Sequence, residues 1–141
     1  MDKIEGMVRE RQLERHFRFV GPVPHSEVVR HYQNCDVFVN LSHTGSLDKA
    51  VLEAMACGRV PITCNEAFTS IFGDYVARLM FEKGNALDLA RRVLDVIEMN
   101  ASSRLVLGRA LRDIVVRGHS VNRLTSKWLT AFQGVIEEEN L

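Results

Sequence analysis

Residues 36–64 read DVFVNLSHTGSLDKAVLEAMACGRVPITC, and this stretch decides the fold. It opens and closes on short apolar runs, which are typical of strands buried in a parallel sheet. Between the runs, a polar loop at 42–47 leads into a helix expected from about Asp48 to Cys57. Gly58 follows, in the position where a residue of left-handed conformation commonly ends a helix. A strand, a helix and a second strand in this order form the repeating unit of an α/β protein.

Short apolar runs on both sides of this unit predict further strands. The run at 36–41 has apolar residues at consecutive positions, which predicts burial on both faces of its strand. Pro61 is expected at the start of its strand, because proline removes a ladder hydrogen bond from a strand interior. We therefore expect three strands and a weaker fourth, over 17–20, 36–41, 60–64 and 77–81.

Amphipathic periodicity predicts helices around these strands. The first opens the chain, and the second begins at Ser26 as its N-cap. Asn85 begins a third helix, with Asp88 three residues later as in a capping box. The last two helices cover about 102–116 and the residues from Ser120 onward. The side chains expected to face the core are Ile4, Met7, Val8, Val28, Val29, Tyr32, Cys35, Ala86, Leu89, Ala90, Val93, Ile97, Leu107, Leu111, Ile114, Val121, Leu124, Trp128, Phe132 and Val135.

The chain has 141 residues, with 18 Lys and Arg balanced by 18 Asp and Glu. This length suits one domain over 1–141, with C-terminal helices over about 102–138. The charge balance disfavours a nucleic-acid binder, and no apolar run is long enough to span a bilayer. The N-terminus does not resemble a signal peptide, and the three cysteines form no C-x-x-C pair. We therefore expect a cytoplasmic protein with reduced cysteines and no bound metal or cofactor.

The loop at 42–47 has the features of an anion site. Parallel sheets bind ligands at the carboxyl ends of their strands, where loops lead into helix N-termini. Gly45 allows the backbone to approach a ligand closely, while Thr44 and Ser46 add hydroxyl donors. A phosphate is the simplest ligand for such a loop. The alternative is that Gly45 only makes the turn.

Two charged residues follow this loop on the helix. A cation in the first turn, Lys49, opposes the helix dipole unless an anion compensates it, and Asp48 is the alternative to a bound anion. Glu53 lies within the otherwise apolar run 50–56, and a buried carboxylate must be paired or hydrogen-bonded. Glu53 either accepts hydrogen bonds from sugar hydroxyls or has a structural role, capping a neighbouring loop.

The motif LEAMACG at 52–58, with DVFV at 36–39 and the loop at 42–49, resembles the glycosyltransferase group 1 domain. That domain is the C-terminal half of retaining GT-B enzymes of glycosyltransferase family 4. The resemblance covers about residues 17–99. It implies a Rossmann-like, three-layer α/β/α domain with a mostly parallel sheet, which binds a nucleotide-sugar donor.

The resemblance also assigns binding roles, although it assigns no catalytic residue here. Glu53 matches the acid that holds the ribose hydroxyls. Gly45, Ser46 and Leu47 match the turn whose amides face the diphosphate, with Lys49 beside it. Val20 and Gly21 match the strand end that borders the base.

The chain departs from the family pattern in two ways. The first acid of the E-x7-E pattern falls at Gly45, and the N-terminal domain that completes such enzymes has no counterpart here. The chain is therefore expected to be a donor-binding fragment of a hexosyltransferase type, inactive without that domain or a separate subunit. Exposed sheet edges would favour self-association, and the full-length protein would be cytoplasmic or peripheral to a membrane. The alternatives are a non-catalytic GT-B-like interaction module and another sugar-nucleotide enzyme of this fold, such as an epimerase.

Overall fold

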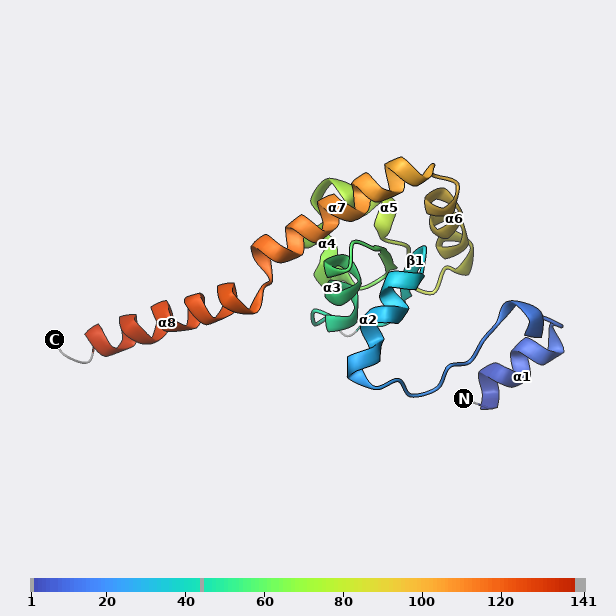
Figure 1. The fold of residues 1–141 in the computed structure, drawn as a ribbon, viewed down its shortest axis with the longest axis horizontal. Coiled ribbons are helices and arrows are strands. Elements are labelled where there is room, and N and C mark those ends of the chain that lie inside the picture. Colours follow the sequence, from blue (N-terminus) through green and yellow to red (C-terminus); the bar gives the residue numbers. More distant parts are fainter. Residues whose placement is uncertain (1, 44, 139–141) are drawn as a thin grey trace.

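The computed structural model describes residues 2–43 and 45–138, in which helices surround a small parallel sheet (Figure 1). We call residues 25–118 the body, because the two strands and the helices packed on them lie there. The α-helices are α1 (Asp2–Glu10), α2 (His25–Asn34), α3 (Lys49–Ala56), α4 (Thr69–Phe72), α5 (Val76–Leu79), α6 (Ala86–Ile97), α7 (Ala101–Gly118) and α8 (Val121–Glu138). The strands are β1 (Val37–Asn40) and β2 (Val60–Thr63), and the 3-10 helices are η1 (Glu14–His16), η2 (Glu66–Phe68) and η3 (Gly73–Tyr75).

The two central strands confirm the predicted βαβ unit. They pair in parallel from Val37 opposite Val60 to Asn40 opposite Thr63. Pro61 is the second residue of β2, close to the start of the strand as expected. The weaker strand predicted over 77–81 is wrong, because α5 takes up most of it. Only a parallel bridge between Thr63 and Met80 remains of that strand.

The strand predicted over 17–20 is also wrong. Residues 17–24 form an irregular linker that runs outside the body from η1 to α2 (Figure 1). A strand needs a neighbouring strand to complete its backbone hydrogen bonds. In this segment the contact found is between side chains: the Phe17 and Phe19 rings stack on each other, with centroids 6.3 Å apart. The predicted burial of β1 on both faces is also wrong, because Val39 remains 39% exposed.

The N-terminal helices differ from expectation in their details. In α1, Val8 is buried, whereas Ile4 and Met7 are exposed because this helix lies apart from the body (Figure 1). The predicted cap at Ser26 is wrong, since α2 begins one residue earlier, after Pro24. Tyr32 is buried on α2 as predicted, but Val29 is exposed.

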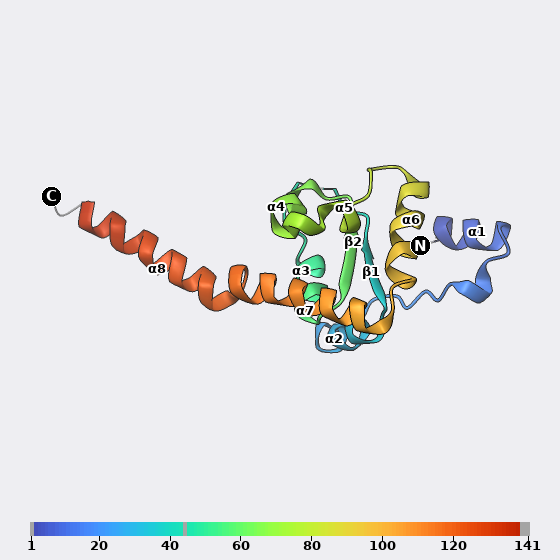
Figure 2. The same ribbon diagram turned by 90° about the horizontal axis from the view of Figure 1, so that it is seen from above.

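Helices cover both faces of the two strands (Figure 2). On one face, α3 packs against both strands and α7 packs against α3 and β2. On the other face lies α6, which buries a stripe made of Leu89, Val93 and Val96. The predicted α6 face is therefore partly wrong, because Ile97, Ala86 and Ala90 are exposed. The buried core contains Val51, Met55, Val60, Ile62, Phe68, Phe72, Leu79, Phe81, Val96, Leu107, Leu111 and Val115.

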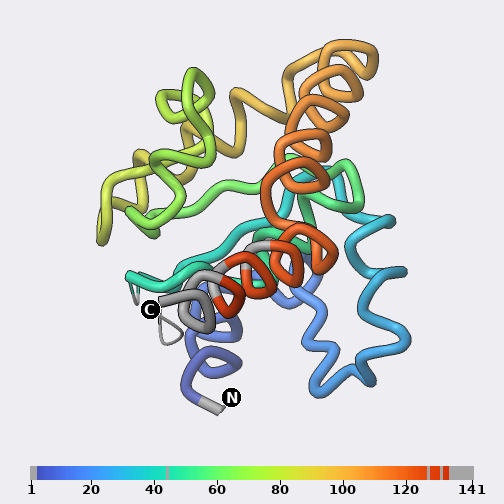
Figure 3. The backbone as a smooth tube through the Cα atoms, turned by 90° about the vertical axis from the view of Figure 1, so that its left-hand side faces the viewer, coloured from blue at the N-terminus to red at the C-terminus, as the bar shows by residue number. Residues whose placement is uncertain are grey.

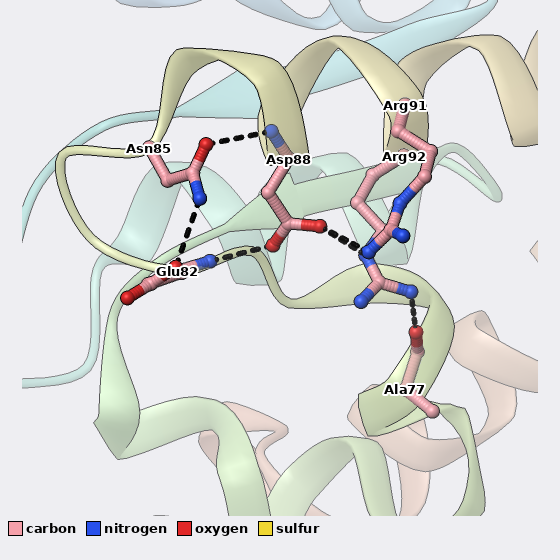
Figure 4. Close-up of polar contacts among 6 residues, drawn as sticks. All are labelled: Ala77, Glu82, Asn85, Asp88, Arg91 and Arg92. Atoms are coloured by element: carbon pink, nitrogen blue, oxygen red, sulfur yellow. Dashed lines mark hydrogen bonds and ion pairs between the residues drawn. The ribbon is translucent and has the colours of Figure 1, made fainter.

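The start of α6 confirms the predicted cap at Asn85 (Figure 4). The Asn85 side-chain oxygen accepts a hydrogen bond from the Asp88 N–H at 3.0 Å. The Asp88 carboxylate does not return this bond but accepts from the Glu82 N–H at 2.8 Å and pairs with Arg91 at 2.6 Å. The Glu82 N–H, followed by Arg91, holds the pKa of Asp88 below its usual value. Arg92 also donates to the Ala77 carbonyl, which connects α6 to α5.

The last helix leaves the body. Figures 1 and 2 show α8 extending away from α7, and Figure 3 shows it in front of the body when viewed from its far end. The prediction that Trp128 and Phe132 are core residues is wrong, because they are 60% and 64% exposed. The predicted Val135 lies outside the side chains that the structure describes. Among the described residues, no helix combines the length and the apolar character needed to cross a membrane.

A close contact between two glycines lets α7 pack on α3. A Cβ atom at Gly108 would lie 2.1 Å from the carbonyl oxygen of Gly58, which follows α3 with φ +71° and confirms its predicted position. Because backbone atoms occupy this space, a side chain at 108 cannot be accommodated by a change of rotamer. The approach also places the Arg112 guanidinium against the Ala56 carbonyl at the end of α3.

We therefore expect Gly108→Ala to lower the free energy of unfolding by about 2–3 kcal/mol through overpacking. Gly118→Ala is the matched control, because nothing lies within 4 Å of a Cβ at this second glycine of α7. Alanine has a higher helix propensity than glycine, so Gly118→Ala should leave the free energy of unfolding unchanged or raise it by less than about 1 kcal/mol. Urea unfolding followed by circular dichroism measures both changes, and equal curves for the two variants would refute the close approach.

Candidate functional site

The predicted anion loop lies at the carboxyl end of β1 and leads into α3. We call residues 42–48 the site loop. Gly45 has φ +74°, a left-handed conformation that favours glycine, and both Ser46 and Leu47 are exposed. Thr44, one of the two expected hydroxyl donors, lies outside the described residues. This conformation of Gly45 fits both expectations for the loop, an anion site and a simple turn.

A buried asparagine that the sequence analysis missed holds this loop in place. Asn65 is fully buried, and its side-chain nitrogen donates to the Ser46 carbonyl at 2.8 Å and to the Asp48 carboxylate at 2.9 Å. Its side-chain oxygen accepts from the Ala67 N–H at 3.1 Å. One side chain thus joins the loop after β1 to the loop after β2. The signal in the sequence was a polar residue directly after an apolar strand.

The same network includes the ends of both strands. The Asn40 side-chain oxygen accepts from the Ser42 N–H at 3.1 Å and from the Thr63 hydroxyl at 3.3 Å. The Thr63 hydroxyl oxygen in turn accepts from the Asn65 N–H at 3.1 Å. Since Asn40 and Thr63 are register partners, these bonds fix the start of the site loop relative to the sheet.

Asp48 is the N-cap residue of α3 by position, but its side chain makes no capping bond. Its carboxylate accepts from Asn65 instead, so it does not occupy the N–H groups at the start of the helix. The N–H groups of Lys49 and Ala50 at the start of the helix have no partner within it, whereas that of Val51 already donates to the Asp48 carbonyl at 3.1 Å. Lys49 is the first residue of α3 and is exposed. The loop thus presents backbone donors and a lysine at a helix N-terminus, an arrangement suited to an anion.

Glu53 lies one turn after Lys49 on α3, so the two residues share one side of the helix. It is partly buried, and its carboxylate accepts a hydrogen bond from the Tyr32 hydroxyl of α2 at 3.0 Å. The expected alternative for Glu53 was a structural carboxylate capping a loop, and the partner found is a helix side chain. A carboxylate has further acceptor capacity after one such bond, so this contact does not prevent a second partner.

The structure does not bring Val20 and Gly21 to the site loop. Both lie in the linker 17–24, which Figure 2 draws near the end of the sheet where β1 begins, whereas the site loop follows the other end. The residues expected to border a base are therefore separate from those expected to face a diphosphate. Their separation has the same cause as the missing strand, since a paired strand over 17–20 would end beside the loop.

A hollow of about 370 Å³ adjoins the site loop on the α6 side of the sheet. The Cys64 thiol, which is buried here, donates to the Leu41 carbonyl at 3.7 Å. His43 is exposed, and its ring nitrogen lies 3.3 Å from the same carbonyl. The hollow is lined by Leu41, His43, Cys64, Phe81, Lys83, Gly84, Asn85, Ala86 and Leu89. These side chains are largely apolar, so the hollow suits a hydrophobic group better than a phosphate.

We expect Asn65→Ala to lower the free energy of unfolding by about 2–3 kcal/mol, because it removes a helix cap and two buried side-chain hydrogen bonds. Asn100→Ala is the matched control: Asn100 caps α7 by accepting from the Ser103 N–H at 2.8 Å, remote from the loop. Losing this cap should lower the free energy of unfolding by only about 1 kcal/mol. Hydrogen exchange should accelerate over 42–52 in Asn65→Ala alone. Equal exchange there in both variants would contradict the anchoring role.

The Tyr32–Glu53 contact predicts a pH dependence. Burial raises the pKa of Tyr32 from 10.0 to about 12, and the hydrogen bond to the Glu53 carboxylate adds to this shift. Above pH 10 the unfolded chain loses the Tyr32 proton while the folded chain keeps it. The stabilisation is therefore complete below pH 10 and is lost as the pH rises towards 12.

Tyr32→Phe should lower stability by about 1–2 kcal/mol below pH 10 and remove this part of the alkaline decline. Denaturant unfolding at a series of pH values measures both effects. Tyr75→Phe changes the other of the two tyrosines and should leave the decline in place. An unchanged decline in Tyr32→Phe would show that another group causes it.

Comparison with known proteins identifies the family. Residues 1–113 match the family described as glycosyl transferases group 1, a range that includes the site loop, Glu53 and Asn65 and ends within α7. Searches of curated proteins and of solved structures gave no match. The matched range covers most of the 141 residues. The chain therefore belongs to the group 1 family of glycosyl transferases.

Proposed function

We propose that the chain is the donor-binding half of a retaining glycosyltransferase of family 4 that takes its sugar from a nucleotide-sugar. One observation carries this proposal: the Asn65 network fixes the site loop so that it leads into α3, with Lys49 and Glu53 one turn apart. Family membership supports sugar transfer as the reaction, and a helix N-terminus after a parallel strand suits the diphosphate of such a donor.

The site loop and Lys49 would meet the diphosphate. The left-handed turn at Gly45 and the exposed backbone of Ser46 and Leu47 support this role. When the bond between sugar and phosphate breaks, negative charge accumulates on the departing nucleotide. Fixed N–H donors, the positive end of the α3 dipole and the Lys49 ammonium would stabilise that charge. Because Asn65 holds the donors before the reaction, little reorganisation is needed.

Glu53 would hold the ribose hydroxyls of the same nucleotide. An ionised carboxylate accepts two hydrogen bonds at once, which suits the adjacent hydroxyls of a ribose. The Tyr32 hydroxyl binds one oxygen of this carboxylate at 3.0 Å and thereby restricts its orientation. Tyr32 is 8% exposed, so its own position is fixed by packing. Tyr32 is thus proposed to orient Glu53, while Glu53 contacts the donor.

The complete enzyme is proposed to have the GT-B architecture, in which this domain is Rossmann-like with three layers. The open face of β1 and the exposed linker 17–24 support a larger sheet than the two strands described. Val20 and Gly21 would border the base once the linker pairs beside β1. Catalysis would also need the N-terminal domain of such an enzyme, because the donor must react in a cleft that excludes water. The donor is a substrate, and we propose no cofactor.

A second candidate function is a non-catalytic interaction module of this fold. Two observations favour it: Gly45 occupies the position of the first acid of the family pattern, and Glu53 already has a partner in Tyr32. Under this alternative the Asn65 network only stabilises the domain. The two functions differ in whether the folded chain binds a nucleotide.

Calorimetric titration of the chain with UDP, GDP and ADP tests the donor-binding proposal. We expect one of the three to bind, and Glu53→Gln to weaken that binding about 5- to 150-fold, as expected for losing a charged hydrogen-bonding group worth about 1–3 kcal/mol. Glu98→Gln is the matched control, because Glu98 is an exposed glutamate at the end of α6. It should bind as the unmodified chain does.

If the folded chain binds none of the three nucleotides, the interaction module becomes the better assignment. Binding that Glu53→Gln leaves unchanged would instead place the nucleotide elsewhere and contradict the role of Glu53. Circular dichroism of each variant confirms that the comparison is made between folded proteins.

A further inference from the structure

Two of the three cysteines lie at the ends of neighbouring helices. Cys35 is the C-cap residue of α2, and Cys57 is the C-cap residue of α3. Both are free thiols with partly exposed side chains. They are far apart in the sequence and form no C-x-x-C motif, so the sequence alone does not pair them. The fold removes this separation, because α2 and α3 pack against each other.

The paired strands bring these two helix ends to the same edge of the sheet. β1 begins two residues after Cys35, and β2 begins three residues after Cys57. The first residues of the two strands, Val37 and Val60, are register partners. Neighbouring strands lie about 4.8 Å apart. The segments that carry the two cysteines therefore enter the sheet side by side.

A hydrogen bond between the two helices lies one turn before the cysteines. The Tyr32 hydroxyl of α2 donates to the Glu53 carboxylate of α3 at 3.0 Å. The Cys35 thiol donates to the Tyr32 carbonyl at 3.2 Å. On the other helix, the Cys57 N–H donates to the Glu53 carbonyl at 3.0 Å. The strand register and this interhelical contact together keep the two cysteines close to each other.

A positive charge at the same edge of the sheet acts on this pair. The Nε atom of Arg59 is buried and has no hydrogen-bond partner among the residues that the structure describes. Burial raises the pKa of the Cys35 thiol above its usual value, whereas the Arg59 guanidinium acts to lower it. The charge of Cys57 also acts on the pKa of Cys35, so the two thiols lie within electrostatic reach of each other. Because a thiol of raised pKa forms little thiolate, Cys35 is the slower nucleophile to start a reaction.

From these observations, we propose that Cys35 and Cys57 form a reversible disulfide that ties the C-terminal end of α2 to that of α3. The two thiols lose two protons and two electrons, which a low-molecular-weight disulfide such as oxidised glutathione accepts. The Cys57 thiolate attacks this oxidant, releases one glutathione thiol and forms a mixed disulfide. The Cys35 thiolate then attacks the Cys57 sulfur, and the second glutathione leaves as a thiol.

The disulfide would restrain the two helices that carry the Tyr32–Glu53 contact. In the reduced chain, this contact depends on a hydrogen bond and on packing. In the oxidised chain, a covalent link one turn away would hold the same helices together when the hydrogen bond breaks. The proposal concerns thiol chemistry at the edge of the sheet where the strands begin, so it does not depend on nucleotide binding.

The third cysteine provides an internal control. Cys64 follows β2, and its thiol donates to the Leu41 carbonyl at the opposite end of the sheet. β2 separates Cys57 from Cys64, and a strand of its length spans about 13 Å, which exceeds the Cα separation that a disulfide allows. The unfolded chain has the reverse preference, because Cys57 and Cys64 are closest in the sequence and close the shortest loop.

Oxidation with glutathione followed by peptide mapping tests the proposal. After free thiols are blocked by alkylation, trypsin releases the three cysteines in separate peptides, 31–49, 50–59 and 60–78. The folded chain should yield peptide 31–49 linked to peptide 50–59, and dithiothreitol should reverse this link. The same treatment in urea should instead favour the link between 50–59 and 60–78.

Serine variants and thermal unfolding complete the test. Cys35→Ser and Cys57→Ser should each abolish the link in the folded chain, whereas Cys64→Ser is the matched control and should retain it. Oxidation of the unmodified chain should raise Tm by about 10 °C, because the disulfide closes a loop in the unfolded state. Circular dichroism checks that each reduced variant is folded.

Four results would overturn the proposal. The first is a folded chain whose thiols stay free or carry only glutathione. The second is a folded chain that links Cys64 as readily as the unfolded chain does. The third is a disulfide that joins two copies of the chain, which its mass reveals. The fourth is a disulfide that fails to raise Tm, which would show that it forms in a distorted chain. None of these results bears on nucleotide binding, so this proposal and the proposed function can fail separately.

Discussion

The hydrogen bonds of one buried amide side chain, that of Asn65, hold the loop of the candidate site against the sheet. Asn65 joins the loop after β1 to the loop after β2, through hydrogen bonds with Ser46, Asp48 and Ala67. A glycine-containing loop is flexible in isolation, and ordering it costs conformational entropy. Asn65 supplies that order from inside the protein, where low polarity strengthens its hydrogen bonds. Lys49 follows this loop as the first residue of α3.

The features that could be predicted from the sequence depend on local interactions. The cap at Asn85 involves residues three positions apart, and the end of α3 at Gly58 needs only one left-handed residue. The βαβ unit at 36–64 was also predictable, since each of its parts has a distinct apolar pattern. For the candidate site, the loop and Glu53 were found in this way, although the partner of Glu53 was not.

The features that could not be predicted depend on distant partners. Phe17 to Val20 has the composition of a strand, but a strand forms only beside another, and the described residues offer none there. The apolar residues Val121, Leu124, Trp128 and Phe132 of α8 have the spacing of a buried helix face, yet this spacing does not reveal which surface would cover them. Asn65 is recognisable as an anchor only when the site loop, about twenty residues earlier in the chain, is placed next to it.

The packing of α7 on α3 has a consequence for the order in which the protein folds during synthesis. The end of α3 is secured by Gly108 and Arg112, and Arg112 follows its partner Ala56 by 56 residues. A nascent chain that ends before α7 thus carries the site loop and α3 without the helix that clamps them. Contacts of such sequence separation form late, because a long segment must be synthesised and ordered first. The site loop and α3 would therefore reach their final arrangement only after most of the chain has emerged from the ribosome.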